Sequence, residues 1–196
     1  DSDLYGRHRQ GKRLTNFNQT LPPPQSDLAQ ELIKDPYHLE FLALDSPIKE
    51  KALQKNLVTR LKDFLVELGA GFAFVGNEYH FQIGGQDFYI DLLFYHLKLR
   101  CYVVIELKTT SFQPEFAGKM NFYLSAMDDL MAHPDDKPSI GIILCQDKNK
   151  MIVEYALRDS KKPIGVSSYR LTETLPKKLA GQLPTALELK NELKSK

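Results

Sequence analysis

Nearly continuous apolar sequence in the middle of the chain predicts two β-strands, FYIDLLFYH (88–96) and CYVVIELK (101–108), joined by a short basic turn. Each carries charge where a strand buried on both faces should have none: Asp91 in the first, Glu106 and Lys108 in the second. Because strand side chains alternate between faces, Glu106 and Lys108 point to the same side. An unpaired buried charge is costly, so we expect these groups to be paired or to bind a metal ion.

An amphipathic pattern predicts one helix over residues 48–68, with leucines every three or four positions along one stripe. Ser46 as N-cap and Pro47 in the first turn mark its expected start. Glu50 precedes Leu57 by seven residues, which is about 20° around a helix and places Glu50 on the same inward stripe. There it either joins the charged cluster or acts only as a first-turn acid favoured by the helix dipole.

The remaining elements follow from the same two periodicities. They are a strand at 72–83 with a hairpin turn at 84–87, a helix at 111–133, a strand at 139–147, a helix at 151–159 and a strand at 163–171. We therefore expect an α/β fold in the order helix, three strands, helix, strand, helix, strand. Its sheet is mixed and flanked by helices on both faces, which explains the doubly apolar central strands.

At 196 residues the chain is long enough for one domain with a real core, and we place that domain at 46–172. Residues 1–45 are polar and proline-rich, with a basic cluster and one short helix at 26–35. We interpret them as a linker or docking arm rather than part of the core, and because the chain begins at Asp1 rather than Met we expect a larger N-terminal region before it. The basic cluster is typical of a solvated tail more than of a DNA contact. Residues 173–196 are Lys-rich and predict a C-terminal surface tail.

Composition excludes several classes of protein without selecting one. A hydrophobic content of 42% and a charged content of 26% are typical of globular domains. No membrane span or signal peptide is predicted. The cysteines, Cys101 and Cys145, lie in apolar strands without metal-ligand spacing, which predicts reduced core thiols in a cytoplasmic protein. The histidines also lack zinc-like spacing. A net charge of +1 neither supports nor excludes nucleic acid as a partner.

The charged cluster has the chemistry of a magnesium site beside a phosphate. Mg²⁺, or Mn²⁺ in its place, accepts one or two carboxylates together with phosphate oxygens; Asp91 and Glu106 would supply the carboxylates and the carbonyl of Leu107 another oxygen. Lys108 would orient the attacking water or hold the phosphate, and Glu50 would reach the metal directly or through water. The alternative is a buried salt-bridge network that serves only structure.

Several phrases of the sequence resemble the PD-(D/E)xK nuclease superfamily, specifically its YhcG-like bacterial branch. They are FLVELGAGFAFVG (64–76), FYIDLLFYH (88–96), VIELK (104–108), FAGKMNFYLSAMDD (116–129), PSIGIILC (138–145) and PIGV (163–166). The resemblance implies a restriction-endonuclease-like core of helix, three strands, helix and strand, and metal-dependent cleavage of nucleic acid. It also implies that Asp91, Glu106 and Lys108 are the motif residues, with Glu50 as the helix acid. Such proteins often accompany restriction–modification or other defence systems.

The sequence departs from the family pattern at one position. Many relatives have Gln-x-x-x-Tyr in the helix after the lysine strand, whereas here Lys119 replaces the glutamine and Tyr123 is retained. Lys119 either contacts a phosphate or pairs with Glu115 one turn earlier, and we favour the ion pair. Tyr89 and Tyr95 share the face of Asp91 by alternation, where they would either line a substrate groove or pack.

Together these features predict a magnesium-dependent endonuclease that hydrolyses phosphodiester bonds in DNA, in genome defence or DNA processing. Cutting two strands favours a homodimer. The alternative is a module that binds nucleic acid, or scaffolds a defence complex, without cleaving.

Overall fold

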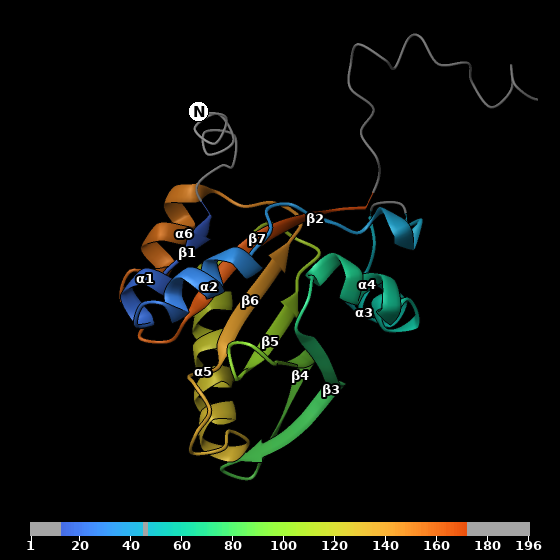
Figure 1. Cartoon of the computed structure of the whole chain (residues 1–196). Coiled ribbons are helices and arrows are strands. Elements are labelled where there is room, and N and C mark those ends of the chain that lie inside the picture. The colour runs from blue at the N-terminus through green and yellow to red at the C-terminus, as the bar shows by residue number, and fades with distance from the viewer. Residues whose placement is uncertain (1–12, 45–46, 172–196) are drawn as a thin grey trace, which may run out of the picture.

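The computed structural model describes residues 13–44 and 47–171, which form a mixed β-sheet with helices on both faces (Figure 1). The strands are β1 (Leu14–Thr15), β2 (Tyr37–His38), β3 (Phe72–Ile83), β4 (Gln86–His96), β5 (Cys101–Leu107), β6 (Ile140–Cys145) and β7 (Ile164–Arg170). The helices are α1 (Phe17–Thr20), α2 (Gln25–Leu32), α3 (Glu50–Thr59), α4 (Leu61–Leu68), α5 (Pro114–Leu130) and α6 (Lys150–Leu157), and a 3₁₀ helix, η1, spans Glu40–Leu42.

The sheet has the strand order β1-β7-β6-β5-β4-β3, and β2 pairs with β7 beside this path. Strands β3, β4 and β5 are antiparallel neighbours, whereas β5, β6 and β7 run parallel to one another. The parallel connections pass through α5 and α6, as expected for crossovers between parallel strands. The predicted fold class, an α/β domain with a mixed sheet flanked by helices, is confirmed.

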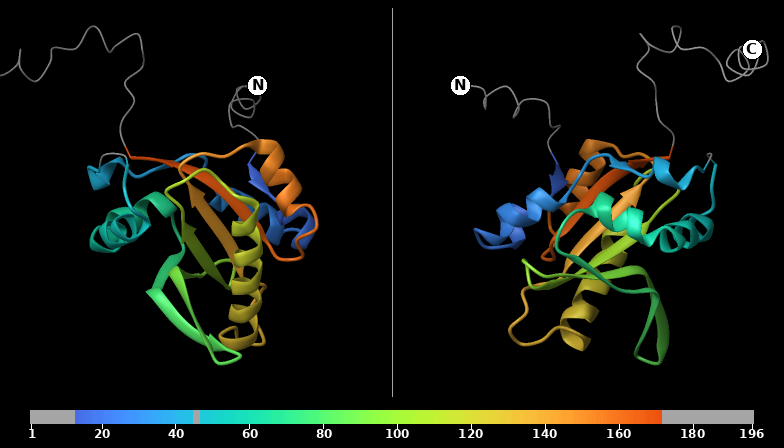
Figure 2. Two further views of the ribbon diagram at one scale, coloured as in Figure 1. Left: turned by 180° about the vertical axis from the view of Figure 1, so that it is seen from behind. Right: turned by 45° about the vertical axis from the view of Figure 1, so that its right-hand side comes forward.

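Two hydrophobic cores lie on opposite faces of the sheet. One contains α5 and α6; the other contains α1 to α4 (Figures 1 and 2). Alternate residues of β5 divide between them: Val103 and Ile105 pack into the core of α1 to α4, and Val104 into the core of α5 and α6. All three side chains are fully buried. This two-sided burial is the reason that the central strands have nearly continuous apolar sequence.

The single helix predicted over 48–68 is two helices, so that prediction is wrong in its continuity. Helix α3 ends at Thr59 and α4 begins at Leu61, with Arg60 between them at φ −104° and ψ 35°. Asn56 and Thr59 each donate a side-chain hydrogen bond to a carbonyl four residues earlier, at 2.8 and 2.9 Å. Such bonds compete with the backbone and bend helices. The apolar stripe continues through the break, so periodicity alone did not detect it.

The predicted start of this helix is also corrected. Lys49 occupies the N-cap position, so α3 begins three residues beyond Pro47. Pro47 lies in a bend rather than in the first turn, and Ser46 lies outside the described residues. Glu50 is therefore the first residue of α3, where a carboxylate is favoured by the helix dipole.

The described part of residues 1–45 packs into the core, which differs from our expectation that it lies outside it. Strand β1 pairs with β7 in antiparallel orientation and β2 pairs with β7 in parallel. Asn16 fixes the approach: its side chain accepts from the N–H of Ile164 at 2.8 Å and donates to the carbonyl of Lys162 at 2.9 Å. The buried apolar residues of this segment are Leu14, Phe17, Leu21, Ala29, Ile33, Tyr37, Leu39 and Leu42. They are scattered among polar residues, which hid them from a periodicity search.

Of the other predictions for the two ends of the chain, the structure describes only the short helix. The short helix expected at 26–35 is α2, which begins one residue earlier with Pro24 at its N-cap position. The tail predicted at 173–196 and most of the basic cluster lie outside the described residues. The domain boundaries at 45 and 172 stay predictions.

None of the described helices is long and apolar enough to cross a membrane. Cys101 and Cys145 are buried and not disulfide-bonded, and burial raises the pKa of each thiol to about 12.

Candidate active site

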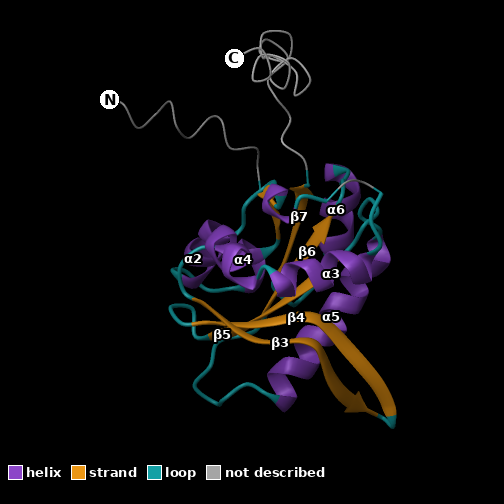
Figure 3. Ribbon diagram, turned by 90° about the vertical axis from the view of Figure 1, so that its right-hand side faces the viewer, coloured by secondary structure: helices purple, strands orange, loops and turns teal. Residues whose placement is uncertain are grey.

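The structure brings five charged residues together where the pairing of β4 and β5 ends. The last paired residues at this end are Leu92 and Ile105, so the next residue on each strand, Asp91 or Glu106, lies just beyond the ladder. Past this point β4 continues with β3 as a hairpin that extends from the sheet (Figure 3). Lys108 follows the end of β5, and the remaining two residues come from helices: Glu50 begins α3, and Lys119 lies in α5.

The two carboxylates replace the missing ladder with side-chain hydrogen bonds. The backbone N–H of Asp91 donates to Oε1 of Glu106 at 3.2 Å, and the N–H of Leu107 donates to Oδ2 of Asp91 at 2.8 Å. Each acid thus accepts from the backbone of the opposite strand. These bonds hold the two carboxylates side by side and keep the backbones of β4 and β5 together at this point.

Burial makes this acid pair electrostatically costly. The side chain of Glu106 is only 2% exposed, and burial, together with the neighbouring Asp91 charge, raises its pKa to about 7. Burial also raises the pKa of Asp91, against the hydrogen bond from Leu107 and the charges of Lys108 and Lys119. Two adjacent acids that resist ionisation, Glu106 buried and Asp91 half-buried, form a site that a cation would stabilise.

Lys108 is held between the helix acid and the buried acid. Its Nζ lies 3.2 Å from Oε2 of Glu50 and 3.9 Å from Oε2 of Glu106. The ammonium also lies 5.2 Å from the ring centre of Phe116, and the hydroxyl of Tyr169 donates to the Lys108 carbonyl at 3.2 Å. Glu50 therefore both joins the cluster and occupies the first turn of a helix, so the two alternatives considered for it hold together.

Lys119 reaches into the cluster from the face of the sheet that α5 covers. Its Nζ lies 3.0 Å from Oε2 of Glu106 and 5.1 Å from the ring centre of Tyr123. Burial alone would lower the pKa of Lys119, but the charge and hydrogen bond of Glu106 outweigh it and raise that pKa. The ion pair favoured from the sequence, with Glu115, is replaced by this one, because the side chain of Lys119 extends to Glu106 on β5.

Gln54 supports the site and was missed in the sequence. Its Nε2 donates to the backbone carbonyl of Asp91 at 2.8 Å, and the residue is buried. A signal was present, because Gln54 lies four residues after Glu50 and three before Leu57, on the inward stripe of the helix. A polar residue on an apolar stripe needs a partner in the core.

The predicted aromatic contacts divide between the site and more distant packing. The hydroxyl of Tyr123 donates to the carbonyl of Tyr89 at 2.9 Å, which ties α5 to β4 beside Asp91. Tyr95 does not join the cluster: it lies four residues along β4, roughly 13 Å away, and its hydroxyl donates to Asp136 at 2.7 Å. Tyr89 is 54% exposed. Substrate contact by Tyr95 stays a prediction.

The donor set fits a single divalent cation that also uses ligands from outside the protein. Among the residues in the described ranges, no group of three or more His, Cys, Asp or Glu side chains forms a ready-made metal site. Asp91 and Glu106 offer two carboxylates, and Oδ1 of Asp91 accepts no hydrogen bond from any described residue. Two carboxylates completed by waters and phosphate oxygens are typical of Mg²⁺. Coordination by the Leu107 carbonyl stays a prediction.

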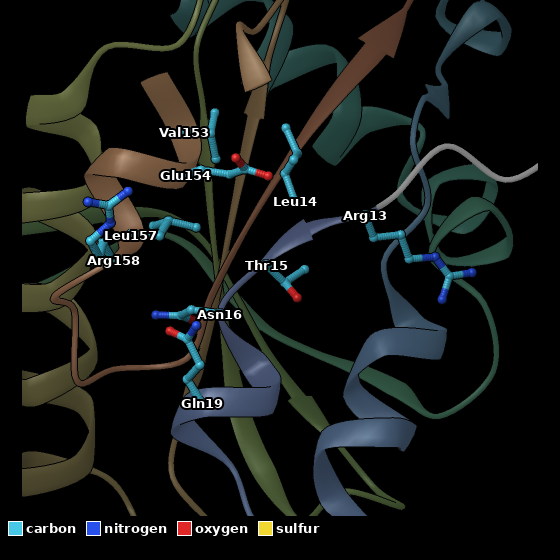
Figure 4. Close-up of a pocket in the computed structure, with 9 residues that line it drawn as sticks. All are labelled: Arg13, Leu14, Thr15, Asn16, Gln19, Val153, Glu154, Leu157 and Arg158. Atoms are coloured by element: carbon cyan, nitrogen blue, oxygen red, sulfur yellow. The ribbon is translucent and has the colours of Figure 1, made fainter. Parts of the chain in front are cut away.

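The cavity drawn in Figure 4 lies elsewhere, between β1 and α6. Its volume is about 300 Å³. It is lined by Arg13, Leu14, Thr15, Asn16, Gln19, Val153, Glu154, Leu157 and Arg158. It shares no residue with the charged cluster, so the candidate active site is the end of the β4–β5 ladder and not this cavity.

Comparisons with known proteins identify the family of the chain. A model of the family described as the YhcG PDDEXK nuclease domain matches residues 30–184. The protein named "Putative nuclease YhcG" from Escherichia coli (strain K12) is 37% identical over 167 residues. That alignment covers 85% of this chain and 44% of the relative, so the chain spans less than half of the relative's length.

Solved structures show weaker likeness. A repair endonuclease from Pyrococcus abyssi has a TM-score of 0.41 and 15% identity, covering 66% of this chain and 50% of that one. EndoMS in a complex with dsDNA has a TM-score of 0.43 and 14% identity, covering 68% and 51%. Family membership therefore rests on the two sequence matches. The residues matched by the family model include both strands and all five charged side chains of the cluster. The chain belongs to the YhcG PDDEXK nuclease domain family.

Proposed function

We propose that this protein is a magnesium-dependent endonuclease that hydrolyses phosphodiester bonds in DNA. The observation that supports this most is a pair of carboxylates, the half-buried Asp91 and the buried Glu106, at the end of the β4–β5 ladder. Lys108 lies next to them. Membership of a nuclease-domain family gives the reaction class. The acid pair is where we propose that this reaction takes place.

Each residue of the cluster has a role in this proposal. Mg²⁺ or Mn²⁺, bound by Asp91 and Glu106, would lower the pKa of a water and neutralise charge on the phosphate. Lys108 orients the attacking water or holds a phosphate oxygen, since its ammonium lies within 4 Å of Glu106 and is only 12% exposed. Glu50 holds that ammonium in place. Gln54 fixes the backbone of Asp91 and so its carboxylate.

The proposal extends to the setting in which the site works. One such site cuts one strand, so cleavage of a duplex favours a homodimer with two sites. The resemblance to the YhcG-like branch supports action in the cytoplasm, in genome defence or DNA processing, alongside restriction–modification or other defence proteins. Light scattering of the purified chain with and without a DNA duplex tests the dimer, which would appear as a doubling of the protein mass.

A second candidate function is a non-cleaving module that binds nucleic acid or scaffolds a defence complex. One observation favours it: two ammonium groups, of Lys108 and Lys119, already lie near Oε2 of Glu106. A salt-bridge network complete in itself would need no metal. The two candidates therefore differ in whether the cluster binds a divalent cation.

Calorimetric titration with Mn²⁺ separates them. We expect the wild-type chain to bind Mn²⁺ and Asp91→Ala to lose binding. The matched control is Asp87→Ala, which removes an exposed aspartate from the same strand and should bind as the wild type does. Absence of binding at millimolar Mn²⁺, by the wild type both alone and with a DNA oligonucleotide present, would contradict the enzyme and leave the scaffold.

A further inference from the structure

The two lysines of the cluster differ in how firmly they are held. Lys108 has a side chain that is 12% exposed and also contacts Glu50. Lys119 has a side chain that is 44% exposed, and the carboxylate that holds it is Glu106. Lys119 therefore lies closer to Glu106 than Lys108 does. It is also the lysine that can move away from Glu106 more easily, because more of its side chain is exposed.

Each carboxylate oxygen of Glu106 accepts one hydrogen bond. Oε1 accepts the backbone N–H of Asp91, and Oε2 accepts the ammonium of Lys119 at 3.0 Å. The bond to Asp91 ties β5 to β4 where the strand ladder has ended. A cation that uses Oε2, alone or together with the second lone pair of Oε1, meets the ammonium of Lys119 there.

A divalent ion and an ammonium repel each other strongly at contact distance in a partly buried site. Metal binding at Oε2 therefore requires Lys119 to withdraw toward solvent, which its exposure allows. A phosphate brought in by nucleic acid offers the released ammonium a new anionic partner. The pair between Lys119 and Glu106 is then replaced by two pairs, one between the metal ion and Glu106 and one between Lys119 and the phosphate.

We propose that Lys119 is a resident counter-ion of Glu106 that competes with the divalent cation, so that metal binding is weak until a phosphate draws Lys119 away. This inference rests on the proposed metal-dependent nuclease function. It predicts that Mn²⁺ and nucleic acid each strengthen the binding of the other, as linkage requires when both displace the same contact.

The first test compares Mn²⁺ affinities by calorimetry without nucleic acid. We expect Lys119→Gln to bind at least about tenfold more tightly than the wild type, because the competing charge is gone. Lys119→Arg keeps the charge and should bind as weakly as the wild type. Lys62→Gln, a change at an exposed lysine of α4, is the control for net charge and should have no effect.

The outcomes distinguish this inference from the function on which it rests. Equal affinity of the wild type and Lys119→Gln, with both binding Mn²⁺, would overturn the competition and leave the nuclease proposal standing. Absence of binding in all variants would overturn both. Binding by Lys119→Gln alone would support competition in its strongest form, with the wild-type lysine excluding the metal.

The second test measures the coupling. A DNA oligonucleotide with phosphorothioate linkages is added before the Mn²⁺ titration, so that binding is measured without turnover. The wild type should gain affinity for Mn²⁺ by a larger factor than Lys119→Gln gains, since only the wild type has an ammonium to release. An equal gain in both proteins would contradict the release of Lys119 to the phosphate.

Discussion

Glu106 is a buried carboxylate, and its titration has a predictable effect on stability. Its pKa rises from the usual 4.5 to about 7 on folding, so between these values the folded protein holds a proton that the unfolded chain has lost. The free energy of unfolding then falls as pH rises through this range and is level above it. In the wild type we expect the free energy of unfolding to fall by on the order of 2 kcal/mol over this pH range, and we expect Glu106→Gln to abolish this fall.

Urea unfolding of both proteins at pH 5 and pH 8 checks this expectation, because titrating groups that do not interact with Glu106 cancel in the difference between them. The metal is left out of both samples. A decline of equal size in wild type and Glu106→Gln would show that Glu106 is not the group responsible.

The same substitution separates a functional site from a structural network. If the acid pair exists for function, Glu106→Gln at pH 8 without metal should leave the melting temperature unchanged or raise it, because it relieves repulsion with Asp91. A network that serves only structure would lose roughly 3 kcal/mol or more when one buried partner is removed. Thermal melts in EDTA distinguish the two, and a large loss of stability would contradict the functional interpretation.

At this scale the sequence predicted the acids better than their partners. Asp91, Glu106 and Lys108 were visible because charge interrupts apolar strands. The contact of Lys119 with Glu106 joins a helix to a strand thirteen residues away, and it depends on how α5 lies on the sheet. Local spacing offered only Glu115 as a partner, and that was wrong.

At the scale of elements, α5 positions Lys119, and the closeness of α5 to the sheet depends on a glycine beneath it. A Cβ at Gly141 of β6 would lie 2.5 Å from the side chain of Met120, which is fully buried. Gly118, on α5 itself, has no atom within 4 Å of such a Cβ. The two glycines therefore predict opposite effects for the same substitution.

We expect Gly141→Ala to destabilise the fold by about 1–3 kcal/mol, because overpacking pushes α5 away from the sheet. Gly118→Ala should stabilise it by about 0.5–1 kcal/mol through helix propensity. Urea unfolding of both variants checks the pair. Similar effects in the two would show that α5 does not pack on β6 as described.

The boundaries of elements were less predictable than their presence. Strands β3 to β7 and both crossover helices follow from periodicity, whereas β1 and β2 were not predicted. Pro114 is correctly placed in the first turn of α5. The break at Arg60 arises from side-chain bonds that leave the apolar stripe intact. Such a break changes backbone geometry without changing the hydrophobic pattern, which is why the pattern did not reveal it.

At the scale of the whole molecule, the segment before residue 45 has to be present for the sheet to be covered. Phe17, Ile33 and Tyr37 are fully buried, and Ile33 lies 3.0 Å from where a Cβ on Gly165 would be. We expect Phe17→Ala to cost about 3–5 kcal/mol. Leu28→Ala, at a residue of α2 that is 41% exposed, is the control and should cost far less.

Unfolding in urea measures both variants. A linker outside the core would make Phe17→Ala as mild as its control, and that result would contradict the packing of this segment. The sequence did not predict the packing. Isolated apolar residues in a polar segment can be assigned to the core only when the edge of the sheet that they cover is known.

The measurement that tests the central claim most directly is cleavage of labelled DNA by the purified chain. Linear duplex, single-stranded and branched substrates are incubated with Mg²⁺, Mn²⁺ or EDTA. We predict cutting by the wild type that needs the metal, is lost in Lys108→Ala and is retained in Lys62→Ala. Cutting in EDTA, or equal cutting by Lys108→Ala, would contradict the assignment of the active site to this cluster.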